Sequence, residues 1–120
     1  MRVTAQALHA APIASLISKS EKARQKVAPG TWQHTMLQAN LAALHLASAL
    51  IKRETNPAEP LPPADLPAAL RALSSMIAKT EAAQPKFPPG TSPHTLLQNR
   101  LHALRLAETL IQAEQPTRSS

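Results

Sequence analysis

The chain has 120 residues, enough for one compact domain, and it contains no cysteine, which excludes disulfide bonds and thiolate metal sites. Its 13 Lys and Arg against 7 Asp and Glu give a formal net charge of +6, which favours an anionic partner such as nucleic acid or an acidic protein. No stretch approaches the ~20 apolar residues of a membrane span, and the first residues lack the hydrophobic run of a signal peptide, so we expect a cytoplasmic protein with no membrane partner.

The sequence repeats itself at an offset of 60 residues. Residues 16–52 match residues 76–112 at 19 of 37 positions without a gap, and both copies contain the pattern PGTxxHTxLQ. Identity of this extent predicts an internal duplication within a single domain. The predicted parts are repeat 1 at about 4–53, a Pro-rich linker at 54–65, repeat 2 at about 66–114, and a tail at 115–120.

The first predicted helix carries apolar residues at helical spacing, among them Ile13 and Ile17, and ends before Pro29 and Gly30. Pro cannot continue a helix, and Gly accepts the positive φ that often follows one. Pro12 lies inside this helix, where we expect it to kink or restart the helix. Thr31 is the natural N-cap of the second helix.

The second helix of each repeat has an unusually broad apolar arc. On a helical wheel the apolar residues of the first copy cover about 200°, and the second copy reproduces this arc. One neighbouring helix covers only a single stripe, so each of these helices needs at least two neighbours. The sequence therefore predicts an all-α fold, a four-helix bundle made of two tandem helix-turn-helix hairpins.

The linker places four Pro within residues 54–65, which favours an extended course. Its length is sufficient to run along the bundle, which would put the two turns at opposite ends. The third helix is predicted to begin after Asp65 as N-cap, with Pro67 in its first turn. Thr91 caps the fourth helix, with Ser92 as a rival cap.

The polar residues retained near each turn are the candidate binding site. They are Lys19, Glu21, Lys26, Thr31, His34, Thr35 and Gln38 in repeat 1, and Lys79, Glu81, Lys86, Thr91, His94, Thr95 and Gln98 in repeat 2. One interpretation is structural, because the two His occupy the position at which a capping box places Glu or Gln. The other is a pair of equivalent anion sites, in which helix N-terminal amides act together with the nearby Lys.

Asn40 and Arg100 occupy equivalent repeat positions within the apolar arc. A polar group there needs a partner, and such residues often fix the register or the subunit arrangement. Alternatively, Asn40 borders a gap between helices and Arg100 extends its charged end to solvent.

The sequence contains no recognisable catalytic or metal-binding motif, and we expect neither enzymatic activity nor a cofactor. The predicted function is a protein-interaction or regulatory module, with a homodimer as a further possibility. The alternative is binding to nucleic acid phosphates through the basic end of the first helix, using Lys19, Lys22, Arg24 and Lys26.

Overall fold

The computed structural model describes residues 5–115, which form four α-helices and contain no strand. The helices are α1 (Ala5–Gln25), α2 (Trp32–Lys52), α3 (Leu66–Ala83) and α4 (Ser92–Glu114), and a short 3-10 helix, η1 (Gln84–Lys86), follows α3. The prediction of an all-helical fold is confirmed. Residue 4, where repeat 1 was predicted to begin, and residues 116–120 of the predicted tail lie outside the described residues.

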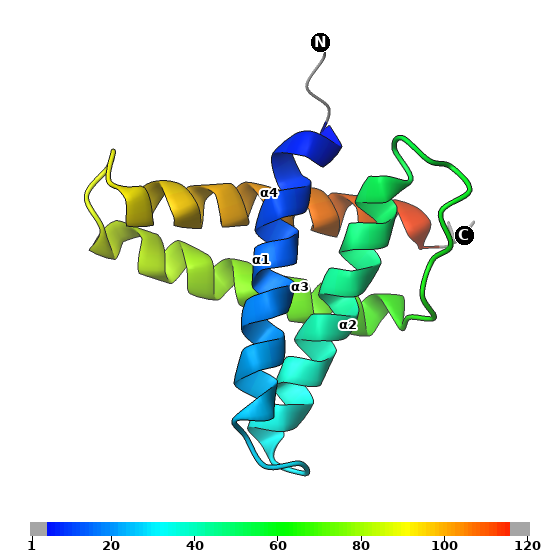
Figure 1. Ribbon diagram of the computed structural model, residues 1–120, viewed down its shortest axis with the longest axis horizontal. Helices are drawn as coiled ribbons and strands as arrows, with labels where there is room; N and C mark the ends of the chain where they lie inside the picture. The colour runs from blue at the N-terminus through cyan, green and yellow to red at the C-terminus, as the bar shows by residue number, and fades with distance from the viewer. Residues whose placement is uncertain (1–4, 116–120) are drawn as a thin grey trace, which may run out of the picture.

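The four helices form two side-by-side pairs that cross each other (Figure 1). Helix α1 packs against α2, and α3 packs against α4, while α2 also contacts both α3 and α4, and α1 contacts α4. We call the connecting end of each pair its tip, which consists of the connection and the first turn of the next helix: residues 26–36 for the α1–α2 pair and residues 84–96 for the α3–α4 pair. Both tips extend away from the crossing.

The expected path of the linker is wrong, because the two helix pairs cross each other. We expected the linker to run along the bundle and the turns to lie at opposite ends, but the tips point in directions transverse to each other (Figure 1). Helices α2 and α4 contact each other and carry the fully buried Ala43, Ala47, Ala103 and Ala107. Small buried side chains of this kind allow helices to approach closely where they cross. The linker then only has to connect the end of α2 to the start of α3.

All four helices contribute to one hydrophobic core. Its largest fully buried side chains are Ile13, Leu44, Leu46, Ile51, Leu73, Leu104 and Ile111. The apolar arcs predicted for the second helices are thus buried over most of their length. Leu96 at the start of α4 is an exception, because it is 47% exposed, and Phe87 in the preceding connection is 37% exposed.

The helix ends follow the predicted capping pattern. Thr31 and Thr91 are the N-caps of α2 and α4, and Asp65 caps α3 by accepting a hydrogen bond of 3.0 Å from the backbone N–H of Ala68. Gly30 and Gly90 have φ values of +87° and +86°, in the left-handed region that favours glycine. The repeated PGT pattern is therefore a turn followed by a helix start.

Pro12 does not restart α1, which continues as one helix from Ala5 to Gln25, but the beginning of α1 bends away from the axis of the rest of the helix (Figure 1). Proline lacks the N–H that would bond the carbonyl of residue 8, so one intrahelical hydrogen bond is lost at this point. The neighbouring Ile13 is fully buried, and its packing offsets that loss.

Removing the cap hydroxyls tests this account of the turns. We expect Thr31→Ala and Thr91→Ala each to lower the free energy of unfolding by about 1 kcal/mol, because each leaves a helix N-terminal N–H without its acceptor. The two losses should add, since the caps lie at different tips. Urea unfolding measures the effect, with Thr95→Ala as the control that changes an exposed Thr one turn further along α4. Equal stabilities of Thr91→Ala and Thr95→Ala would contradict the capping role.

Candidate functional site

The cap threonines of the predicted site already use their hydroxyls within the turns. Thr31 Oγ1 donates to the carbonyl of Ala28 at 2.7 Å and accepts from the backbone N–H of His34 at 3.2 Å. Thr91 makes the same bonds with Pro88 and His94, at 2.7 and 3.4 Å. These residues therefore hold the tips in shape, which is a structural role.

The structure does not bring the two predicted histidines together. His34 lies in the first turn of α2 and His94 in the first turn of α4, and both side chains are half-buried. The two histidines therefore belong to different tips. In residues 5–115 no three His, Asp or Glu side chains are placed to hold a metal ion. Any function of these histidines therefore has to arise at each tip separately.

The other predicted site residues do not form one cluster. Lys79 Nζ contacts Met36 Sδ at 3.6 Å, which links α3 to the first turns of α2. Glu81 forms an ion pair with Arg105 of α4. Thr35 Oγ1 donates to the carbonyl of Thr31 at 3.2 Å. The remaining members are exposed on the helices and tips: Lys19, Glu21, Lys26, Gln38, Lys86, Thr95 and Gln98.

Exposed apolar side chains at the tips were missing from the predicted site. Trp32, the first residue of α2, is 71% exposed, although it is the only Trp in the chain. The equivalent residue of the second repeat is Ser92. Because the same cap forms with Ser at this position, the turn does not require a tryptophan. Alignment of the two sequence copies could have identified Trp32 as a candidate, because Ser92 stands at the same position of the second copy.

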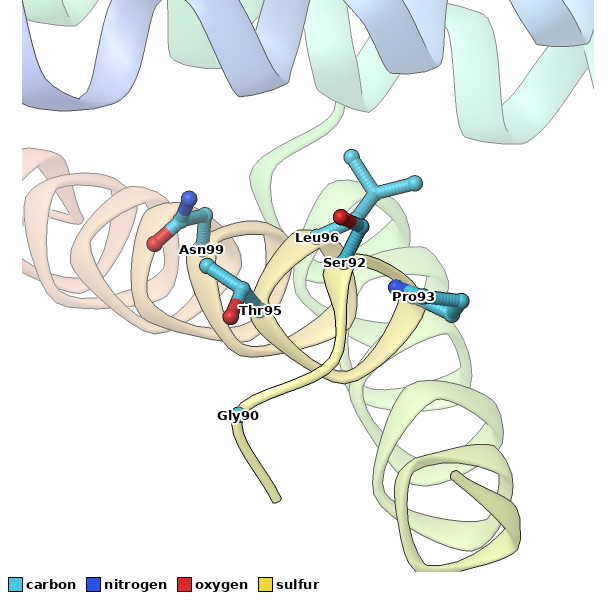
Figure 2. Close-up of a pocket in the computed structure, with 6 residues that line it drawn as sticks. All are labelled: Gly90, Ser92, Pro93, Thr95, Leu96 and Asn99. Carbon is cyan, nitrogen blue, oxygen red and sulfur yellow. The ribbon is translucent and has the colours of Figure 1, made fainter. Parts of the chain in front are cut away.

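A shallow apolar groove of about 670 Å³ lies along the first turns of α4 (Figure 2). It is lined by Gly90, Ser92, Pro93, Thr95, Leu96 and Asn99. Ser92 and Leu96 are four residues apart and project from the same side of the helix. The two tips therefore present different surfaces, a projecting Trp32 on one and a groove beside Leu96 on the other.

A second groove, of about 610 Å³, lies between α1 and α4 and is strongly basic. It is lined by Ser15, Ser18, Lys19, Lys22, Ala23, Lys26 and Arg100. Arg100 reaches Ser15 Oγ at 3.5 Å, and its Nε is buried without a hydrogen-bond partner. Arg100 thus lies partly within the predicted apolar arc, with its Nε buried, while its guanidinium end lines the groove together with the lysines of α1.

No protein-family model matches the chain, and neither a curated protein nor a solved structure matches it. No helix in residues 5–115 combines the length and the apolar character needed to cross a membrane.

Proposed function

We propose that this protein is a non-catalytic, protein-binding module of the cytoplasm, built from two duplicated helical hairpins whose tips are the binding surfaces. The duplication is supported by the 19 identities in 37 aligned positions and by the matching caps Thr31 and Thr91. It is also supported by reciprocal packing, since α1 contacts α4 as α3 contacts α2.

The observation that carries the binding proposal is the exposure of Trp32. A tryptophan side chain left in water forgoes the stabilisation that its burial would give, and the equivalent Ser92 shows that the cap does not need it. Tryptophan is among the residue types that contribute most to the affinity of protein interfaces. Its place at a projecting tip makes it accessible to a partner without any change in the helices.

The Trp32→Ser variant tests this role. We expect the free energy of unfolding to stay within about 0.5 kcal/mol of the wild type, because the side chain is exposed and Ser is the residue of the other repeat. We expect affinity for the protein partner to fall more than about tenfold, the loss typical of a buried interface aromatic. The partner is obtained by affinity capture from a lysate of the native host at physiological salt, followed by titration of the purified protein.

Two further measurements make this test specific. Because the chain has a single Trp, a blue shift of its fluorescence on adding the partner reports burial of Trp32 alone. The control variant combines Lys22→Ala with Arg24→Ala and should leave capture unchanged at physiological salt, where exposed charges are largely screened. Equal capture by the wild type and Trp32→Ser, or capture of no protein, would reject the proposed interface.

A further inference from the structure

We propose that the basic groove between α1 and α4 binds the phosphodiester backbone of double-helical nucleic acid. Nucleic acid binding through the basic end of the first helix is the alternative function predicted from the sequence. The groove is a defined site at which such binding can occur. This site is distinct from Trp32, so it does not depend on the proposed protein interface.

Three lysines of α1 form one edge of the groove. Lys19, Lys22 and Lys26 are spaced at i, i+3 and i+7, which places them on one face of the helix. All three are exposed, and the only acidic residue of α1, Glu21, does not line the groove. The row is about 10 Å long at ~1.5 Å per residue. With long side chains that extend beyond both ends of the row, the three lysines can reach about three consecutive phosphates of one strand.

Arg100 adds a fourth cation from α4, a helix that is distant in the sequence. Within residues 5–115 its one polar contact is a long one to Ser15 Oγ, at 3.5 Å, and its buried Nε has no hydrogen-bond partner there. A guanidinium with unused N–H groups is suited to phosphate oxygens, which accept charge-assisted hydrogen bonds in a forked geometry. The groove thus presents donors from two helices to one ligand.

The second repeat shows that the fold does not require this concentration of charge. The residues at the positions equivalent to Lys22 and Arg100 are Ala82 and Asn40. The seven groove positions therefore carry four cationic residues here, whereas the equivalent seven positions carry two, Lys79 and Lys86. Like charges gathered along one groove repel one another, and an anionic ligand relieves that repulsion.

The form of the groove favours a duplex over other anions. A single phosphate group contacts one or two of these cations, whereas a row of three lysines with an open face fits a polymer of regularly spaced charges. A single strand is less suited, because Trp32 and Phe87 are the only aromatic side chains and neither lines the groove. The inferred binding is therefore to the backbone and independent of base sequence.

The salt dependence of binding to a random-sequence DNA duplex tests the proposal. We expect log K to fall with log salt concentration with a slope of about −3 to −4, which is −0.9 for each of about four neutralised phosphates. Combining Lys22→Ala with Arg100→Asn installs the residues found at the equivalent positions. This double variant should reduce the slope by about 2 and the affinity about 100-fold near 50 mM salt, since each released counterion contributes about tenfold there.

The matched control combines Lys79→Ala with Lys86→Ala, which removes the same charge from the other repeat. It should change the affinity by less than about threefold, because charges remote from the bound phosphates are screened. Circular dichroism checks that each variant is folded, and the exposed Lys22→Ala alone should still reduce the slope by about 1. Equal losses in the two double variants, no duplex binding near 50 mM salt, or tighter binding to polyglutamate than to the duplex would each overturn the proposal.

Discussion

Leu104→Ala is expected to lower the free energy of unfolding by about 3 kcal/mol, a value within the range for truncation of a fully buried leucine. Leu104 has no exposed surface and belongs to the single core to which all four helices contribute. Truncation removes apolar atoms from the core and leaves a cavity that the neighbouring helices fill only in part. Because a domain of this size has a total stability of about 5–15 kcal/mol, the loss is a large fraction of it.

The same change at the equivalent position of the first repeat should have a similar effect. Leu44 is also fully buried, so Leu44→Ala is expected to cost about 3 kcal/mol as well. Urea unfolding measures both values, and melting temperatures should fall by roughly 10 to 15 °C. Leu96→Ala is the control: its side chain is 47% exposed, and the variant should stay within about 1 kcal/mol of the wild type. A loss at Leu104 no greater than at Leu96 would contradict the burial argument.

The helices and their ends could be predicted because they depend on local chemistry. Thr31, Asp65 and Thr91 precede apolar periodic segments, and a side-chain oxygen at such a position accepts the free N–H groups of the helix start. Gly30 and Gly90 follow prolines at positions where the chain needs positive φ. These requirements involve only a few consecutive residues, so a single sequence contains them.

The crossing of the two helix pairs could not be predicted in the same way. A broad apolar arc shows that a helix needs several neighbours, but it does not fix the direction in which they run. That direction depends on how the side chains of α2 and α4 fit together, including the fully buried Ala47 and Ala107. The length of the linker indicated the wrong path, because a loop longer than necessary costs little free energy.

The candidate surfaces likewise contain residues that are close together in the sequence, which could be predicted, and residues that only the fold brings together. The lysine row of α1 is visible in the sequence because its members are close together on one helix. Arg100 is 74 residues beyond Lys26 in the sequence, and only the packing of α1 on α4 places it in the same groove. Trp32 was predictable in principle, since Ser92 stands at its repeat position, but a tryptophan beside a helix start is also compatible with burial.

Cutting the chain between Pro57 and Ala58 should abolish cooperative folding of both fragments. The two residues are exposed in a turn of the linker, so the cut interrupts no helix. Each fragment keeps one helix pair but loses the half of the core that the other pair provides. At about 2 kcal/mol for each fully buried Leu or Ile, exposing three of them removes an amount comparable with the whole stability of a small domain.

Circular dichroism of the fragments 1–57 and 58–120 gives the measurement. We expect low helicity and no thermal transition for either fragment alone, because isolated short helices are marginal in water without tertiary packing. An equimolar mixture should recover the helicity of the intact chain, since the two apolar faces can cover each other again. Introducing Leu104→Ala into the second fragment should weaken this association about 100-fold or more, which corresponds to about 3 kcal/mol. A fragment that unfolds cooperatively on its own would show instead that each helix pair has an independent core.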